Sequence, residues 1–284
     1  PLQRRGERKF SCMGGLKSRA VALIVCIALI LVGWFGGTAI QNMSGNLITA
    51  QASGLKANTV VMQIGDQEIT AGEYLYWLTS ACDVFYQYYG ITDWDMALTD
   101  DMTVGEYVME QADYYVSQYA AIRQMSAEMG IGLSEEQQAE MDNMHAYYVD
   151  YYGGEEMYAY MLAYAGLNED LLYDSNMVPF LYVNVCDQLL GEGGALEPTD
   201  ENLQTFAQTH GYTGLSDEEL LMYYEDTSYG APYDYVNTYI DGMEVVKTEH
   251  YDDINVATFY PALLTAREDL VMPTENTGST EEPA

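Results

Sequence analysis

Residues 20–40 constrain this chain more than any other part, because they pass without a charge and are mostly Leu, Ile, Val, Trp and Phe. A helix of that length can cross the hydrocarbon core of a bilayer. Basic residues dominate the preceding tail, against the single acid Glu7, and Lys and Arg near a span stay on the cytoplasmic side. They are Arg4, Arg5, Arg8, Lys9, Lys17 and Arg19. We therefore expect a single-pass cell-membrane protein with its N-terminus inside and the bulk of the chain extracytoplasmic.

A cleaved secretory signal peptide is the alternative interpretation of the same segment. The apolar part of such a peptide is usually about 7–15 residues, which is shorter than the segment found here. The Ala-x-Ala sequence that cleavage would use lies well beyond the apolar segment, at residues 50–52. A lipoprotein would use Cys26, but Val25 stands where a small residue is expected. The sequence favours a retained anchor, and cleavage stays open.

The chain is strongly acidic, with 44 Asp and Glu, 10 Lys and Arg, and a formal net charge of -34. After Lys56 the basic residues are Arg123, Lys247 and Arg267, whereas every acid except Glu7 lies in that part. Like charges repel, so nucleic acid is excluded as a partner, and anionic lipid headgroups do not attract this part. The negative charge favours solubility and contact with basic segments of other chains.

The predicted fold is mostly α, with a small β-hairpin. A hairpin is predicted because residues 60–64 form a short run rich in β-branched side chains and Gly65-Asp66 is typical of a turn. Residues 67–69 would then form the second strand of the hairpin. Capping boxes, in which a hydroxyl and a carboxylate or amide satisfy first-turn amides, predict helix starts at Thr70, Thr103, Ser134 and Ser216. Further helices are expected over residues 155–165, 169–190, 199–209 and 256–270. Pro179 predicts a kink or a split within the second of these. A loop is expected at 228–234 and a strand at 243–249.

These elements divide the chain into successive regions. They are a cytoplasmic basic tail (1–19), a transmembrane anchor (20–40), a flexible linker (41–57), a helical domain (58–198), a short insertion (199–241), a C-terminal strand and helix (242–270) and a disordered tail (271–284).

Three stretches of the helical domain occur in a recognisable order: VVMQIGDQEITAGEYLYWL from Val60, AAIRQMSAEMGIGLSEEQ from Ala120 and YYGGEEMYAYMLAYAGLNEDLL from Tyr151. The order is a strand and turn before an Ile-Thr helix start, a Gly-Ile turn before a Ser-Glu-Glu start, and a Gly-Gly-Glu-Glu helix before a Gly-Leu turn. It resembles the N-terminal helical domain of the SurA-like and PrsA-like extracytoplasmic chaperones, a peptidyl-prolyl isomerase family. The resemblance covers residues 60–190 and implies a multi-helix domain that binds polypeptides.

The sequence departs from that family after residue 198. In the family a parvulin-type isomerase domain commonly follows and starts with an Ala-x-His-Ile-Leu strand, but here Gly211 and Tyr212 follow His210 and too few residues remain to close that fold. The resemblance implies that residues 242–270 return to pack on the helical domain, as if the parvulin domain were missing. Because an isolated two-stranded ribbon is marginal in water, we expect residues 244–248 to add a third strand, testable by cross-linking Met62 to Val246.

The sequence contains none of the usual catalytic or metal-binding motifs. Gly-x-Ser-x-Gly, His-Glu-x-x-His and Cys-x-x-Cys are absent, and the aspartates at 93–101 lack the turn glycine and distal glutamate of an EF-hand. His145, His210 and His250 fit ordinary helical or terminal positions, with a weak cation site near His250 as the alternative. We therefore expect no catalytic residue, no metal and no cofactor. Cys82 and Cys186 either form one disulfide or remain buried thiols.

Tyrosine is abundant, with 27 residues, and is accompanied by 16 methionines. Many tyrosines occur as doublets, and neighbours on a helix point about 100° apart, so both cannot face one core and some must face solvent or line a groove. Tyrosine and methionine surfaces bind varied apolar chains. The predicted client-binding residues are Tyr114, Tyr115, Tyr147, Tyr148, Tyr151, Tyr152 and Met157. A tyrosine-rich core whose hydroxyls reach solvent is the alternative.

These observations together predict a membrane-anchored, extracytoplasmic chaperone-like protein that holds unfolded or newly exported polypeptides without turnover chemistry. Two other classes stay open. One is a degenerate peptidyl-prolyl cis-trans isomerase acting through residues 199–241. The other is a non-catalytic cell-surface scaffold, in which the tyrosines would be buried.

Overall fold

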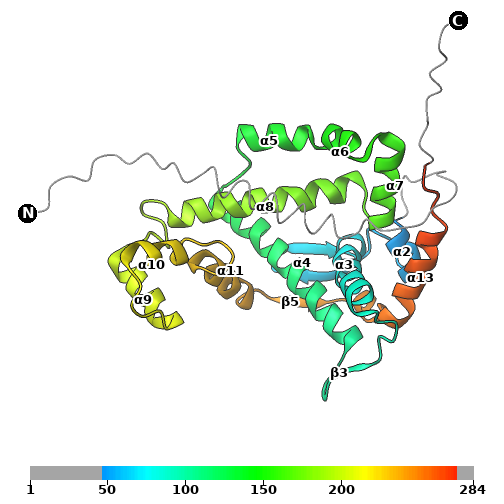
Figure 1. Cartoon of the computed structure of the whole chain (residues 1–284), viewed down its shortest axis with the longest axis horizontal. Coiled ribbons are helices and arrows are strands. Elements are labelled where there is room, and N and C mark those ends of the chain that lie inside the picture. Colours follow the sequence, from blue (N-terminus) through cyan, green and yellow to red (C-terminus); the bar gives the residue numbers. More distant parts are fainter. Residues whose placement is uncertain (1–46, 274–284) are drawn as a thin grey trace, which may run out of the picture. The chain divides into compact units, whose positions relative to one another are not determined.

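A computed structural model describes residues 47–273 of the chain (Figure 1). Its elements form a mostly helical fold with one three-stranded and one two-stranded antiparallel sheet, which confirms the predicted class of helices with a small sheet. In order they are α2 (Ile48–Ser53), β1 (Val60–Ile64), β2 (Gln67–Thr70), α3 (Ala71–Tyr89), β3 (Ala97–Thr99), β4 (Met102–Thr103), α4 (Val104–Met129), α5 (Glu135–Asp142), α6 (Met144–Tyr152), α7 (Glu155–Ala165), α8 (Glu169–Leu190), α9 (Asp200–His210), α10 (Asp217–Tyr224), α11 (Ala231–Asp241), β5 (Val245–Lys247), α12 (Glu249–Asp252) and α13 (Val256–Glu268).

The predicted cytoplasmic tail and transmembrane anchor, residues 1–40, lie outside the described residues, as do residues 274–284 of the predicted tail. Among the helices of residues 47–273, none combines the length and apolar character that a bilayer span needs.

The flexible linker predicted over 41–57 is wrong where α2 forms. This helix buries Ile48, Thr49 and Ala50 and packs against α13 and α3. The Thr49 side chain lies against Gly166, which ends α7 in the left-handed region with φ 73°, so a side chain at that position would collide with it. A six-residue helix is unstable by itself, and its stability here comes from tertiary packing that the local sequence does not reveal.

The three-stranded sheet has the order β2-β1-β5, so residues from the two ends of the described chain meet in it. Met62 lies opposite Lys247 and Gln63 opposite Val246. The Thr248 amide donates to the Val61 carbonyl at 3.0 Å, which continues the ladder past β5. Both the hairpin and the third, C-terminal strand are therefore confirmed.

The main core lies between this sheet, the α3–α4 pair and the C-terminal helices α12 and α13. Figure 1 shows α3 and α4 running alongside each other next to the strands. Apolar side chains from β1, β2 and each of the four helices are fully or almost fully buried, among them Val61, Ile69, Leu75, Val108, Tyr251 and Leu263. The C-terminal segment is thus part of the same core as the first strands.

Capping boxes are present at Thr103, Ser134 and Ser216, as predicted. At Thr70 the hydroxyl accepts from the Glu73 amide at 3.3 Å, but the predicted reciprocal half is missing because the Glu73 carboxylate binds Arg123 at 2.7 Å. Helix α8 continues through Pro179 as one element, so the predicted split is not observed.

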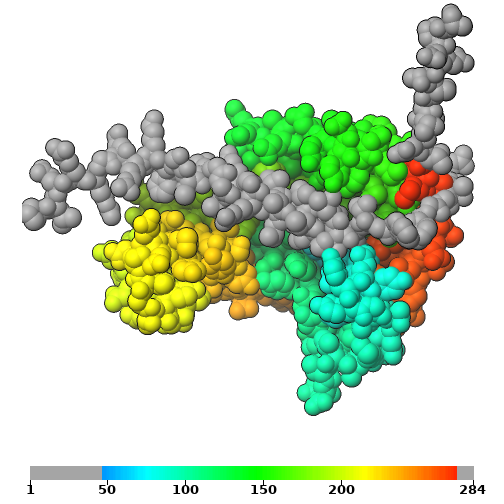
Figure 2. Space-filling model, viewed as in Figure 1, coloured from blue at the N-terminus to red at the C-terminus, as the bar shows by residue number. Residues whose placement is uncertain are grey.

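Besides α2, helix α12, helix α11 and the β3–β4 hairpin were not predicted. Helix α11 begins at Ala231 inside the expected loop 228–234, with Pro232 in its first turn, and packs against α4 and α8. The β3–β4 hairpin follows α3 and carries the exposed side chains of Met96 and Leu98 at or beside it. Figure 2 shows this hairpin projecting from the surface.

Residues 199–241, the predicted insertion, contain three helices and no strand. Phe206 of α9, Tyr224 of α10 and Ala231 of α11 form a small cluster of their own, which Leu190 and Leu196 join. Figure 2 shows α9 and α10 as a yellow lobe. The region is therefore a helical extension with its own small core.

The predicted alternative of a Cys82–Cys186 disulfide is wrong. Cys82 on α3 and Cys186 on α8 are both buried and free. Burial raises the pKa of the Cys82 thiol well above its usual value and that of Cys186 to about 12. Both behave as small apolar core residues, which was the second interpretation of the sequence.

Candidate functional site

The first group of predicted tyrosines lies on α4, against α3. The ring of Tyr115 stacks on buried Trp77 with centroids 5.0 Å apart and an interplanar angle of 16°. Tyr114 meets Tyr115 edge-on at 5.8 Å and stays exposed, and its hydroxyl lies 3.2 Å from that of Tyr233 on α11. Trp77 also contacts Tyr119 at 4.7 Å. Tyr115 is thus held by the α3–α4 pair, and Tyr114 presents the group to solvent.

The second group lies on α6 and α7. The rings of Tyr147 and Tyr151, one helical turn apart, are near-parallel with centroids 6.2 Å apart, and these residues are 57% and 50% exposed. Behind them, Tyr148 and Tyr152 are half-buried and meet their exposed neighbours edge-on at 5.4 Å and 5.0 Å. Tyr148 stacks on the buried Tyr158 of α7. An exposed pair therefore rests on a half-buried pair, which rests on a buried tyrosine.

Tyr76 joins the two groups, although the sequence did not single it out. Its ring contacts Trp77 edge-on at 5.0 Å. Tyr76 also packs, as Tyr148 and Tyr152 do, against the cluster of Tyr158, Leu167 and Leu172. The structure therefore connects the tyrosines of α4 with those of α6 through α3. Met157, the remaining predicted residue, is half-buried on α7.

Tyr76, Trp77 and Tyr158 are the supporting residues that sequence reasoning missed. Tyr76 and Trp77 directly follow the core residues Tyr74 and Leu75 on α3, so α3 is aromatic on more than one face. The run Tyr74-Leu-Tyr-Trp77 is a signal that could have indicated this, because neighbouring helical positions cannot share one stripe.

Four of these tyrosines have raised pKa values and stay protonated near neutral pH, namely Tyr76, Tyr114, Tyr148 and Tyr152. Burial, with a smaller contribution from Tyr148, raises the pKa of Tyr76 to about 12. Burial also raises the pKa of Tyr148, Tyr152 and Tyr114, the last with help from its hydrogen bond to Tyr233. The group therefore presents ring faces and protonated hydroxyls, which can both donate and accept hydrogen bonds.

His145 joins α6 to α7 and α8 near these rings. Its Nδ1 lies 2.8 Å from Glu169 Oε1 and its Nε2 lies 3.1 Å from Glu155 Oε1. The Tyr158 hydroxyl donates to the other Glu169 oxygen at 2.7 Å. A neutral imidazole has one N–H, so donating to both carboxylates requires the imidazolium form. These two hydrogen bonds raise the pKa of His145.

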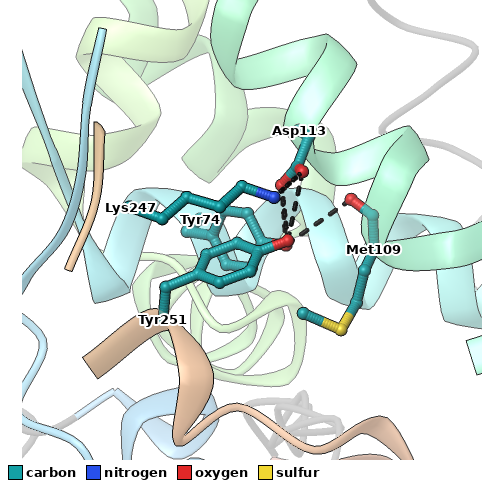
Figure 3. Close-up of polar contacts among 5 residues, drawn as sticks. All are labelled: Tyr74, Met109, Asp113, Lys247 and Tyr251. Atoms are coloured by element: carbon teal, nitrogen blue, oxygen red, sulfur yellow. Dashed lines mark hydrogen bonds and ion pairs between the residues drawn. The ribbon is translucent and has the colours of Figure 1, made fainter. Parts of the chain in front are cut away.

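A second polar cluster lies where the C-terminal segment meets α3 and α4 (Figure 3). The Asp113 carboxylate accepts hydrogen bonds from the Tyr74 hydroxyl at 3.0 Å, the Tyr251 hydroxyl at 3.1 Å and Lys247 Nζ at 2.7 Å. The Tyr74 hydroxyl also lies 3.5 Å from the Met109 carbonyl. Burial raises the pKa of both tyrosines, so both stay protonated and donate to the Asp113 carboxylate.

The other two histidines have single carboxylate neighbours. His210 Nε2 lies 2.7 Å from Asp234 Oδ2, between α9 and α11, and His250 Nδ1 lies 3.6 Å from Asp253 Oδ2. Within residues 47–273, no group of three or more His, Cys, Asp or Glu side chains is arranged to hold a metal ion.

No family model, curated protein or solved structure matches this chain.

Proposed function

We propose that this chain is a membrane-anchored, extracytoplasmic chaperone-like protein, similar to the SurA-like and PrsA-like chaperones, that holds unfolded or newly exported polypeptides. The observation that carries the proposal is the exposed, near-parallel pair of Tyr147 and Tyr151 on α6. A contiguous exposed apolar patch often marks a binding site, and the two adjacent, near-parallel rings form a contiguous exposed surface.

The way this pair is supported favours binding. Tyrosine has a large ring with a polar end and few rotatable bonds, so it loses little conformational entropy on contact. Edge contacts from Tyr148 and Tyr152 hold the two rings before any partner arrives. Ring faces accept many side chains and hydroxyls can bond to peptide groups, so such a surface tolerates varied client sequences.

The anchor and the charge support the same proposal. Residues 20–40 would keep the protein at the membrane, where newly exported chains emerge. The acidic charge of the remaining chain would keep it soluble there and attract the basic segments of clients.

The proposal does not include prolyl isomerisation. The insertion at 199–241 is a helical extension, and the predicted client-binding tyrosines and His145 lie outside it. A scaffold with fully buried tyrosines is less favoured, since the α6 pair is half-exposed or more.

The test is suppression of aggregation of a reduced, unfolded model protein by the full chain in nanodiscs of zwitterionic lipid, with empty nanodiscs as the blank. We expect suppression at several-fold molar excess. The variant Tyr147→Ser with Tyr151→Ser should lose most of it, because both substitutions remove exposed rings without opening the core.

The matched control is Tyr88→Ser with Tyr89→Ser, at the end of α3. These neighbours are 65% and 70% exposed, so the control removes a comparable pair of exposed rings elsewhere. It should suppress aggregation like the unaltered chain. No suppression by the unaltered chain, or equal losses in both variants, would contradict the proposal.

A further inference from the structure

The chain binds two of its own cations, the exposed Lys247 and the buried Arg267, in seats that each consist of a tyrosine ring and a carboxylate. Lys247 Nζ lies 4.0 Å from the centroid of the Tyr251 ring and 2.7 Å from Asp113 Oδ2. The guanidinium carbon of Arg267 lies 4.4 Å from the centroid of the Tyr164 ring, and its nitrogens bind Asp83. In each seat the ring's electron-rich face and the carboxylate both favour the cation.

The exposed face of α6 has the same two components. Tyr147 and Tyr151 present rings to solvent, and exposed Asp150 lies on the same helix, three positions after Tyr147 and next to Tyr151. Residues three apart on a helix are neighbours on its surface. We call these three residues the α6 seat.

Helices α5 to α7 contain no lysine or arginine. Between Arg123 and Lys247 the sequence contains neither residue. His145, the one histidine on α6, already lies between Glu155 and Glu169. Arg123, Lys247 and Arg267 each bind an acid elsewhere, namely Glu73, Asp113 and Asp83. The acids of α5 to α7 are Glu135, Glu136, Glu140, Asp142, Asp150, Glu155 and Glu156.

We propose that the α6 seat binds arginine side chains of client polypeptides, so that the clients held here are chains with arginine-rich basic segments. This inference rests on the proposed holding function and names its substrate class. Guanidinium is planar and weakly hydrated, so it stacks on an aromatic face and pairs with a carboxylate more readily than ammonium does. Lysine-rich segments should bind, but more weakly.

Charge complementarity excludes the obvious competitors for this face. A second copy of the chain would bring the same acidic surface, and nucleic acid or anionic lipid would be repelled. A purely apolar segment could contact the rings, but it would gain nothing from Asp150 and the surrounding acids. The comparison between a cationic and a neutral ligand of the same shape is therefore the decisive one.

The experiment measures fluorescence anisotropy of two labelled, unstructured peptides with the full chain in nanodiscs of zwitterionic lipid. One peptide carries four arginines among Gly, Ser and Leu, and the other carries citrulline, a neutral isostere, at the same positions. We expect the arginine peptide to bind at least about fivefold more tightly at physiological salt, as one exposed cation–π contact with a neighbouring acid would give.

Variants then locate the preference. Tyr147→Leu with Tyr151→Leu keeps apolar area but removes the ring faces, and should reduce the preference for arginine to near unity. Tyr147→Phe with Tyr151→Phe keeps the rings and should retain it. Asp150→Asn should weaken it. Tyr88→Leu with Tyr89→Leu, at the exposed end of α3, should leave it unchanged.

Equal affinities for the two peptides would overturn the arginine seat. If aggregation suppression persists in that case, the holding function stands with an apolar rather than a basic client. An arginine preference that survives in the leucine variant would also overturn the seat, because the general acidic field would then explain it. If neither peptide binds and aggregation is not suppressed, the holding function fails as well.

Discussion

Arg267 and Asp83 form a bidentate ion pair in the core, although they lie 184 positions apart in the chain. Arg267 Nη1 lies 2.7 Å from Asp83 Oδ1, and Arg267 Nη2 lies 2.9 Å from Asp83 Oδ2. The Arg267 side chain is 4% exposed and the Asp83 side chain 1% exposed. The Tyr260 hydroxyl donates to Asp83 Oδ1 at 2.6 Å, and Arg267 Nε donates to the Tyr164 carbonyl at 2.9 Å. Burial opposes the arginine charge, but the bonds to Asp83 outweigh it and raise the Arg267 pKa. The pair connects α13 to α3.

Arg267→Met should lower the free energy of unfolding by about 3–5 kcal/mol, because it leaves the Asp83 carboxylate buried without its counter-charge. Urea unfolding of the full chain followed by tryptophan fluorescence measures this. Lys247→Met is the matched control, since that side chain is 42% exposed and its ion pair with Asp113 should contribute less than about 1 kcal/mol. Similar losses of unfolding free energy in the two variants would show that burial does not increase the contribution of the Arg267–Asp83 ion pair to stability.

Gln63→Cys with Val246→Cys should form a disulfide under mild oxidation, because these residues lie directly opposite each other on β1 and β5. Antiparallel partners have Cα separations near 5 Å, within disulfide range. Gln63→Cys with Val245→Cys is the control, since a one-residue shift points the second thiol to the opposite face of the sheet. Peptide mapping by mass spectrometry distinguishes the two, and equal cross-linking would contradict this register.

The contacts of His145 should make the α6–α7 region dependent on pH. Its pKa is raised in the folded chain, so the stabilisation is fully present below the ordinary histidine value near 6.5 and is lost as pH rises through the higher folded value. NMR titration of the imidazole and hydrogen exchange of the α6 amides measure the two effects. Glu155→Gln with Glu169→Gln should return the His145 pKa toward its ordinary value. A titration at or below that value in the unaltered chain would refute the contacts.

Cys82 and Cys186 should react with alkylating agents only after unfolding, because both thiols are buried and burial raises the pKa of each. Mass spectrometry of tryptic peptides, with and without denaturant, measures each cysteine separately. Reducing agent should leave the unfolding midpoint unchanged, since these two thiols are unpaired. Rapid labelling of Cys186 in the folded chain would indicate that α8 opens from α4.

Local signals predicted most element boundaries. The helix starts after Thr103, Ser134 and Ser216 follow from capping boxes that span four residues, and the helix ends at Gly130 and Gly153 follow from glycines in the left-handed region. The third strand was also predicted, because an isolated hairpin needs a partner and residues 243–249 alternate.

The failures share a physical cause. Helix α2 and helix α11 lack strong local signals and are stabilised by packing on α13 and on α4. In the candidate site, the sequence identified Tyr147 and Tyr151 among several tyrosine doublets. It did not show that these two are exposed whereas Tyr148 and Tyr152 are half-buried.

The amino-acid sequence by itself determined the helical class, the cap positions and the charge, because each depends on composition or on residues a few positions apart. Tertiary structure decided that Asp83 pairs with Arg267, that Cys82 and Cys186 stay apart, and that Tyr76 joins two tyrosine groups. These outcomes depend on which helices meet, and contacts between residues distant in the chain leave no local pattern to read.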